Sequence, residues 1–173
     1  EAGIGADVHL STQTSTLNHL AVNFWRRQGV SRIVLAREAT VDEIRMIRDN
    51  SDAEIEVFAH GALCISYSGR CLLSRYLSGR DANQGNCSHP CRWKYSLIEE
   101  KRPGHPMEII EYARGTEILS SKDLCLIDRI PDYANAGVTA LKIEGRMKSL
   151  YYAANTTRVY RHAARCAQDP EKT

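Results

Sequence analysis

The sequence has no apolar stretch approaching the roughly 20 residues that a membrane-spanning helix requires. Its first residues, 1–5, lack a basic segment followed by an apolar run, so they do not form a secretory signal. There is also little excess charge, since 23 Lys and Arg face 21 Asp and Glu and leave a net charge of +2. We therefore expect a cytoplasmic protein whose overall charge neither requires nor excludes a nucleic-acid partner.

Two common hydrolase motifs are also absent. The chain has neither the HExxH pattern of zinc peptidases nor the GxSxG turn of serine hydrolases. Its composition is otherwise ordinary, with 43% hydrophobic and 25% charged residues, which excludes disordered and fibrous classes. We expect a globular protein whose chemistry depends on other residues.

Short apolar runs at residues 8–10, 32–36 and 54–59 indicate three strands. Between them lie two amphipathic segments of helical spacing. Ser15 or Thr16 is a candidate cap for the first helix, whose apolar positions are Leu17, Leu20, Ala21 and Phe24. Thr40 and Glu43 form a capping box for the second helix, which presents Ile44 and Ile47 on one face. This strand–helix alternation predicts an α/β fold with a parallel sheet.

The alternation returns after residue 120. We expect a helix from Ser121 to Ala136, kinked or broken at Pro131, a strand at 138–143 and a last helix at about 148–165. Four strands are half of an eight-stranded barrel, so the chain is either a small open sheet or the C-terminal half of a TIM-type (βα) barrel that lacks its first strands. The expected divisions are 1–60 and 121–166 for βα barrel units, 61–120 for a cysteine-rich insertion, and 167–173 for a linker or tail.

The insertion would be an unusually long irregular segment unless something other than secondary structure organised it. Residues 107–112 and 116–119 are candidates for a small hairpin within it. Five of the six cysteines of the chain lie in or just after it: Cys64, Cys71, Cys87, Cys91 and Cys125. In a cytoplasmic protein such thiols more often bind metal than form disulfides. Their spacing does not match the paired CxxC of structural zinc, and it favours an iron–sulfur cluster over zinc or redox thiols. Cys166, on the last helix, is expected to take no part.

Several blocks of sequence resemble one known family. Residues 56–64 and 67–74 are similar to the signature of the collagenase-like peptidase family U32, and residues 80–85, 91–95 and 141–149 agree with it. The resemblance implies a barrel-like catalytic domain that extends beyond this chain at its N-terminus, so the missing strands or a partner subunit would complete it. Although the family was named for peptidases, better understood members are oxygen-independent hydroxylation factors for tRNA, rRNA or a quinone precursor.

The resemblance also implies a cofactor. Relatives hold a [4Fe–4S] cluster on four cysteines, which would be Cys64, Cys71, Cys87 and Cys125, with Cys91 as the alternative fourth ligand. Prephenate is implied as the hydroxyl donor in the RNA branch. We therefore expect iron–sulfur-dependent hydroxylation of RNA bases. Two alternatives are a peptidase and a hydroxylase of a quinone precursor, while a purely structural role for the cluster is a third.

The polar residues that follow the predicted strands are the candidate site residues, because barrel active sites lie at the carboxyl ends of strands. We expect catalytic roles for Glu38, His60, Glu144 and Arg146, and substrate binding by Gln13, Arg37, Arg92, Trp93 and Lys142. Each has a simpler interpretation. Lys142 can pair with a neighbouring carboxylate, Trp93 can shield the cluster instead of stacking on a base, and His60 can be an ordinary hydrogen-bonded group at a strand end. In the peptidase alternative, His60 would pair with Cys64 as its nucleophile.

Overall fold

The computed structural model describes residues 5–93, 95–105, 107–108, 122–146 and 148–168. Its main sheet contains β1 (Val8–Leu10), β2 (Val30–Val34), β3 (Glu54–Gly61), β6 (Leu124–Cys125) and β7 (Ala140–Glu144). The α-helices are α1 (His19–Arg27), α2 (Val41–Asp49), α3 (Leu73–Ser78), α4 (Ile130–Asn135) and α5 (Leu150–Gln168). Four short 3₁₀ turns are η1 (Thr12–Thr14), η2 (Ala82–Gln84), η3 (Pro90–Arg92) and η4 (Ile127–Arg129).

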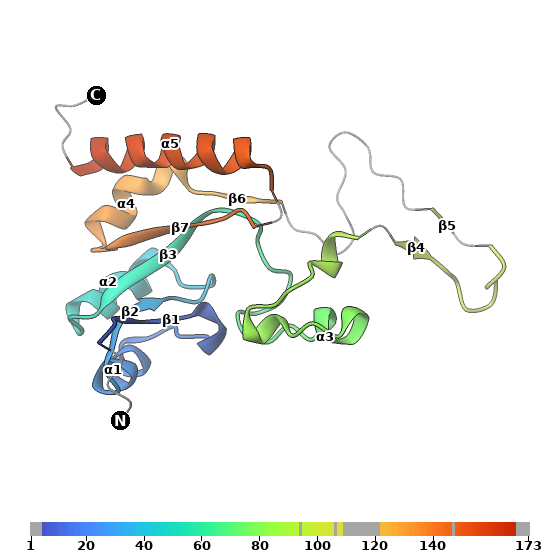
Figure 1. Cartoon of the computed structure of the whole chain (residues 1–173), viewed down its shortest axis with the longest axis horizontal. Helices are drawn as coiled ribbons and strands as arrows, with labels where there is room; N and C mark the ends of the chain where they lie inside the picture. The colour runs from blue at the N-terminus through green and yellow to red at the C-terminus, as the bar shows by residue number, and fades with distance from the viewer. Residues whose placement is uncertain (1–4, 94, 106, 109–121, 147, 169–173) are drawn as a thin grey trace.

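The sheet is mostly parallel. Strand β1 pairs with β2, β2 with β3, and β3 with β7, all in parallel (Figure 1). Strand β6 is antiparallel to the end of β3, where His60 pairs with Cys125. The α/β class is confirmed, although the sheet has five strands in the described residues rather than the four that the sequence indicated.

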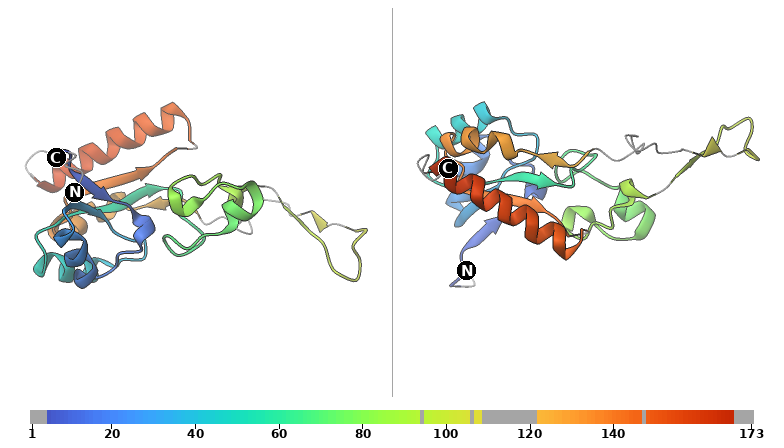
Figure 2. Two further views of the ribbon diagram at one scale, coloured as in Figure 1. Left: turned by 60° about the horizontal axis from the view of Figure 1, so that its bottom comes forward. Right: turned by 90° about the horizontal axis from the view of Figure 1, so that it is seen from above.

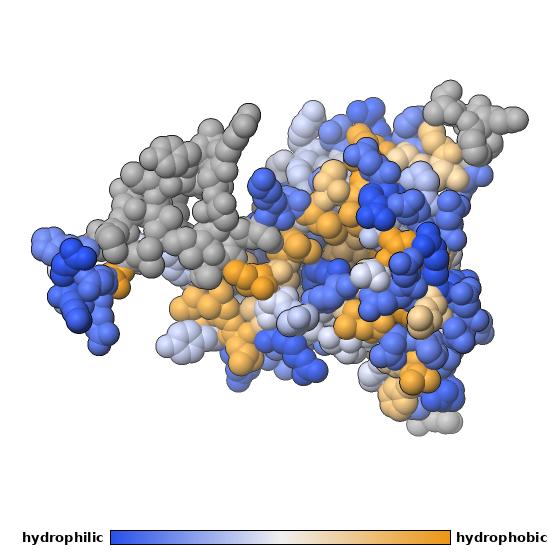
Figure 3. All heavy atoms as spheres, turned by 180° about the vertical axis from the view of Figure 1, so that it is seen from behind, coloured by the Kyte–Doolittle hydropathy of each residue, from blue (hydrophilic) through white to orange (hydrophobic). Residues whose placement is uncertain are grey.

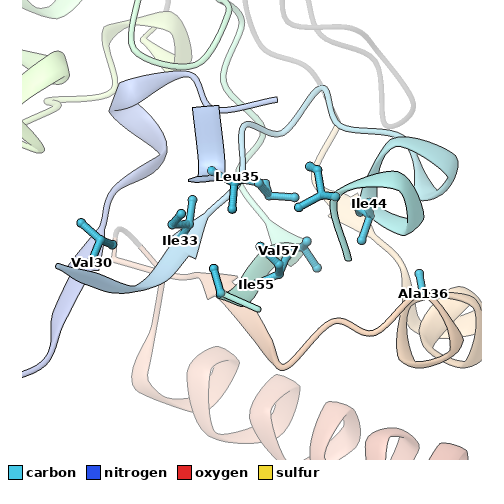
Figure 4. Packing of buried hydrophobic residues seen from close by; sticks show 10 residues of the cluster. Val30, Ile33, Leu35, Ile44, Ile55, Val57 and Ala136 are labelled. Carbon is cyan, nitrogen blue, oxygen red and sulfur yellow. The ribbon is translucent and has the colours of Figure 1, made fainter. Parts of the chain in front are cut away.

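One face of this sheet is covered by helices and contains the apolar core (Figure 4). Val22 of α1 and Ile44 and Ile47 of α2 pack against the strands and are buried, as are Ile33 and Ile55 below them. Further along β3, Ala59 contacts Ile130 of α4 and Tyr160 of α5 in a second cluster. Because side chains alternate along a strand, the odd-numbered residues of β3 all face the helices.

The opposite face of the sheet is polar. It carries Glu54, Glu56 and Phe58, three of the four even-numbered residues of β3. Arg32 of β2 pairs with Glu54 at 2.5 Å and with Glu56 at 3.8 Å, and Lys142 of β7 pairs with Glu56 at 3.7 Å. Charged side chains therefore link three neighbouring strands on the face away from the core.

The capping box at Thr40 and Glu43 is confirmed, and Ile44 and Ile47 are buried as predicted. The cap of the first helix was predicted wrongly. Asn18 occupies the N-cap of α1 and accepts a hydrogen bond from the Ala21 N–H. Leu20 is 70% exposed, and Val22 is the residue of α1 that is fully buried against the sheet.

The long helix expected from Ser121 to Ala136 is also wrong. Its described residues form strand β6, the turn η4 and the short helix α4. Pro131 lies in the first turn of α4, where a missing N–H removes no helical hydrogen bond. Proline thus marks the start of a helix here rather than a kink. The predicted strand at 138–143 and the last helix at 148–165 correspond to β7 and α5, each displaced by about two residues.

The segment between β3 and β6, residues 62–123, is called the insertion below. It leaves the carboxyl end of β3 and extends away from the sheet, carrying α3, η2 and η3 (Figures 1 and 2). Its strands β4 (Ser96–Leu97) and β5 (Met107–Glu108) pair in antiparallel fashion. The predicted hairpin partner at 116–119 lies outside the described residues. Within the described part of the chain, no helix is long and apolar enough to cross a membrane.

Candidate functional site

Two glycines attach the insertion to the strand ends. Gly61, with φ +106°, ends β3 so close to β7 that an added Cβ would lie 2.1 Å from the Glu144 carbonyl oxygen. Gly69, with φ +73°, lies against η1, and its Cβ would be 1.9 Å from the Gln13 carbonyl oxygen. Only glycine permits both the positive φ and the close approach. These contacts bring the cysteine-bearing loops to the carboxyl edge of the parallel strands.

A pocket of about 190 Å³ opens at this edge, here called the thiol pocket. Its walls include Cys64, Cys71, Cys87 and Cys91 from the insertion. The strand ends contribute Thr12, Gln13, Arg37, Glu144 and Arg146 to the same walls. Cys125 is not among the lining residues. It lies on β6 and is exposed, with the Tyr160 hydroxyl 3.9 Å from its sulfur.

Two of the pocket thiols have altered acidity. Burial raises the pKa of Cys64, the neighbouring Cys71 and Cys87 add to this, and Arg37 opposes it. Burial likewise raises the pKa of Cys91, and the other three pocket thiols add to this rise. The neighbouring sulfurs are thus near enough to Cys64 and Cys91 to disfavour the ionisation of these two thiols, and a positive group among them would reverse this.

The described residues contain no group of three or more His, Cys, Asp or Glu side chains placed to hold a single metal ion. The four thiols therefore share a pocket without forming a zinc-type tetrahedron. Four thiols around one cavity are donors that an iron–sulfur cluster could use, since each of its irons takes one cysteine.

The ends of β2 and β7 supply one wall of the thiol pocket. The Arg37 guanidinium stacks on the Phe58 ring at 3.8 Å and lies 3.7 Å from the Glu144 carboxylate. Its Nε is buried without a hydrogen-bond partner among the described residues. Glu38 accepts a hydrogen bond from the Ser68 N–H at 2.9 Å. Its second carboxylate oxygen is buried and also has no hydrogen-bond partner among the described residues. Arg37 thus has a donor to spare beside the pocket.

A second cavity of about 290 Å³ adjoins the first and is called the cationic recess. It is lined by Ala62, Ser88, His89, Arg92, Trp93, Glu144, Arg146 and Lys148. Five of these residues also line the thiol pocket: Ala62, His89, Arg92, Glu144 and Arg146. Trp93 is 46% exposed, so one side of the ring remains open to solvent.

The cations of the recess are held by specific contacts. Arg146 donates to the carbonyls of Gly85 at 2.8 Å and Cys87 at 2.9 Å, which fixes the loop bearing Cys87. Arg92 donates to the Leu63 carbonyl at 3.2 Å and lies 3.8 Å from Asp123, which also pairs with Lys148 at 2.7 Å. Burial would raise the pKa of Asp123, but its hydrogen bond to Lys148 and the nearby positive charges lower it instead.

Three of the residues predicted to be catalytic or substrate-binding, Glu38, His60 and Lys142, line neither cavity. The His60 Nδ1 lies 3.1 Å from the Tyr160 hydroxyl, which donates to the Ala59 carbonyl and accepts from the Leu126 N–H. Burial is the main reason that the pKa of Tyr160 rises to about 12. Lys142 pairs with Glu56 on the polar face, as its simpler interpretation anticipated.

Sequence reasoning missed three residues that build the site. Ser68 is buried and accepts a hydrogen bond from the Arg37 N–H at 3.2 Å. His89 lines both cavities and adopts φ +56°, and burial lowers its pKa. Asp123 joins Arg92 to Lys148. Only His89 could have been found from the sequence, because it lies between Cys87 and Cys91. The contacts of Ser68 and Asp123 join segments that are far apart in sequence.

Comparison with known proteins gives a consistent picture. A Bacillus subtilis protein named tRNA hydroxylation protein P1 is 47% identical over 95% of this chain, which spans 39% of that protein. An uncharacterized protease of Methanocaldococcus jannaschii is 44% identical over 92% of the chain, again 39% of the relative. The Escherichia coli 23S rRNA 5-hydroxycytidine C2501 synthase is 39% identical over 90% of the chain, which covers 23% of that enzyme. No solved structure gives a significant match.

The chain therefore spans less than half the length of these three relatives. The family model described as Peptidase family U32 matches residues 1–173, the whole sequence. This agrees with the resemblance carried by the blocks around Cys64, Cys71 and Arg146. The chain belongs to peptidase family U32.

Proposed function

We propose that this chain is the cluster-binding part of a longer protein that hydroxylates bases in RNA without molecular oxygen. The observation that carries the proposal is that a pocket lined by four thiols adjoins a cationic recess lined by Trp93. The names of the Bacillus subtilis and Escherichia coli relatives support RNA as the substrate class.

The thiol pocket suits a [4Fe–4S] cluster better than a single zinc ion, because its four thiols are spread around a cavity and are not placed to hold one ion. The cluster would supply one-electron chemistry at the edge of the substrate site. The Arg37 guanidinium, with its unpartnered Nε, would offset the negative charge of the thiolates. Arg146 would hold the Cys87 loop in place through its two carbonyl contacts.

The fourth ligand is better assigned to Cys91 than to Cys125 in this proposal. Cys91 lines the same pocket as Cys64, Cys71 and Cys87, whereas Cys125 lies on β6 beside Tyr160. The first three ligands are those that the family resemblance implied.

The cationic recess would hold the anionic reactants. Arg92, Arg146 and Lys148 can meet a phosphate or a carboxylate, and an arginine fork binds either in bidentate fashion. The hydroxyl donor would be prephenate, which is a dicarboxylate. Glu144, shared by both cavities, is the nearest carboxylate that could accept a proton from a bound reactant.

We also propose that the sheet is part of a larger (βα) barrel. Helices cover one face of the sheet, and the other face is lined with Arg32, Glu56 and Lys142. A barrel interior would enclose that polar face, and the site would then lie at the carboxyl rim, as in other barrels. Further strands from the longer protein would complete the closure.

The peptidase alternative has less support. A cysteine nucleophile requires a lowered pKa and a histidine partner, yet burial raises the pKa of Cys64. His60 contacts Tyr160 instead. Among the described residues of the thiol pocket, no hydrogen bond joins a histidine ring to a thiol.

Iron and acid-labile sulfide analysis of protein purified without oxygen tests the cofactor. We expect about four irons per chain, as a [4Fe–4S] cluster requires, with a large loss in Cys64→Ala and Cys91→Ala. Cys166→Ala on α5 is the matched control and should retain the metal. If Cys91→Ala keeps the wild-type iron content and Cys125→Ala loses it, the fourth ligand is Cys125 rather than Cys91.

A chimaera tests the reaction. This chain would replace the matching region of the Bacillus subtilis relative in cells that lack the natural copy, and tRNA nucleosides would be examined by mass spectrometry. We expect a nucleoside heavier by one oxygen atom, also in cells grown without oxygen, and its loss in Cys64→Ala. Cleavage of a collagen-like peptide by metal-free protein, with no change in RNA, would instead support the peptidase.

A further inference from the structure

The first half of the insertion has a surface that the proposed site does not use. Residues 65–80 contain three arginines, two tyrosines and no acidic residue. On α3, Arg75 and Tyr76 follow the N-cap residue Leu72 by three and four positions, so these side chains share one helix face. Together with Tyr67 and Arg70 from the preceding loop, they are called the tyrosine–arginine face.

This face points into solvent. Tyr67 is 71% exposed and Tyr76 is 86% exposed, and Leu72 is exposed beside them. The other side of α3 is anchored, since Ser74 is fully buried and both Ser74 and Ser78 contact the Ser88 hydroxyl. Viewed from behind, hydrophobic residues also gather on the insertion in Figure 3. The tyrosines are therefore presented by a fixed helix and a glycine-anchored loop.

The charge of the face is of one sign. Arg70 forms no ion pair with any described side chain, and Arg75 lies 3.4 Å from Asp81 but remains mostly exposed. Arg80 bonds the neutral Asn86 side chain and so keeps its charge uncompensated. Exposed arginines beside exposed aromatic rings match a ligand that combines phosphates with flat bases.

The face also borders the thiol pocket. Ser68, Gly69, Cys71 and Leu73 line the pocket, and they alternate along the chain with the exposed Tyr67, Arg70 and Leu72. One short segment thus contributes a wall to the pocket and a surface beside it. A strand of nucleic acid lying on this surface would pass directly by the pocket mouth.

We propose that the tyrosine–arginine face binds a single-stranded segment of RNA next to the target base, with Tyr67 and Tyr76 stacking on unpaired bases and Arg70 contacting phosphate. This inference rests on the proposed function and extends it, because it assigns RNA binding to residues outside the thiol pocket and the cationic recess. Selection of unpaired bases would follow, since paired bases leave no face free for stacking.

Fluorescence anisotropy with a labelled single-stranded oligoribonucleotide tests the stacking, using the full chain loaded with cluster. We expect Tyr76→Ala to weaken binding about fivefold to a hundredfold, the range of one lost stacking contact. Tyr67→Ala should act in the same direction. Tyr151→Ala, which removes an equally exposed tyrosine from α5, should leave affinity unchanged.

The dependence of binding on salt separates the arginine contact from the stacking. Arg70→Gln should reduce the slope of log affinity against log salt by about 0.7, the effect of one lost phosphate contact on a single strand. Tyr76→Ala should leave that slope unchanged. Arg165→Gln on α5 is the control for loss of an exposed arginine. Iron content and circular dichroism confirm that each variant is folded.

Three results would overturn the inference. If wild-type protein binds the RNA with a steep salt dependence and Tyr76→Ala binds equally well, the face is not the RNA contact, while the proposed function stands. A dimer in sedimentation that depends on Tyr76, with unchanged RNA affinity, would assign the face to a second copy of the chain. If the wild type shows no salt-dependent RNA binding, both the inference and the proposed function fail.

Discussion

The sheet layer and the insertion are stabilised by different kinds of interaction. In the sheet layer, Ile33, Ile44 and Ile55 are fully or nearly fully buried between strands and helices. In the described part of the insertion, Ile65, Leu72 and Leu77 are exposed, and the buried positions are serines and a proline, Ser68, Ser74 and Pro90. Apolar burial therefore holds the sheet, whereas hydrogen bonds and close backbone contacts hold the insertion.

This difference explains why the cysteines lie where they do. A segment with a thin apolar core gains much of its stability from a bound group that joins distant points of the chain. The proposed cluster, bound to Cys64, Cys71, Cys87 and Cys91, would join both ends of α3 to the loop that precedes β4. It would therefore stabilise the insertion more than the sheet layer.

The sharpest test of this comparison is a pair of matched isoleucine substitutions. Ile55→Ala in β3 leaves a cavity in the core and should lower the free energy of unfolding by about 2–5 kcal/mol. Ile65→Ala in the insertion should change it by less than about 0.5 kcal/mol, because that side chain is 44% exposed. Urea denaturation followed by circular dichroism measures both values. Equal losses would contradict the division between the two regions.

A pair of glycines tests how the insertion is attached. Gly79→Ala, at φ +70° with open space around it, should cost about 1 kcal/mol from backbone strain alone. Gly69→Ala adds a collision with the Gln13 carbonyl and should cost about 1–3 kcal/mol more. Limited proteolysis and iron content report on the insertion directly. Retention of iron and protease resistance in Gly69→Ala would show that this contact is dispensable.

The sequence predicted the sheet layer better than the site, for a physical reason. Periodicity and capping are local signals, so β3 and the Thr40 cap of α2 were found at or near their positions. Strand β6 was missed because only two residues form it and its pairing with β3 spans more than 60 residues of chain. The family blocks identified the cysteines, but the contacts of Ser68, Asp123 and Tyr160 are long-range and leave no pattern in the sequence.

The helix starts provide a smaller contrast between the two regions. Helix α2 begins with a complete capping box, whereas the N-cap residue of α3, Leu72, provides no side-chain hydrogen bond. Thr40→Ala removes the hydrogen bond to the Glu43 N–H and should cost about 1 kcal/mol, a typical value for a lost N-cap. Thermal unfolding measures this loss. Thr40→Ser, which keeps the hydroxyl, is the control and should remain close to wild type.

The smallest expected effect concerns the acid stability of the same cap. Hydrogen bonds from the Thr40 N–H and hydroxyl lower the pKa of Glu43 from its ordinary value of 4.5. A carboxyl whose pKa is lower in the folded state stabilises the fold above pH 4.5, and this contribution is lost as pH falls through the folded-state value. Glu43→Gln should therefore be less stable than wild type at pH 7 by about 0.5 kcal/mol, since the group is exposed and screened. The gap should narrow as pH falls below 4.5 and close below the lowered folded-state pKa of Glu43, because the wild-type carboxyl is then protonated as well. Urea denaturation of both proteins from pH 3 to pH 7 measures the gap. A gap that stays constant with pH would mean that the charge of Glu43 contributes nothing and that only its shape matters to the cap.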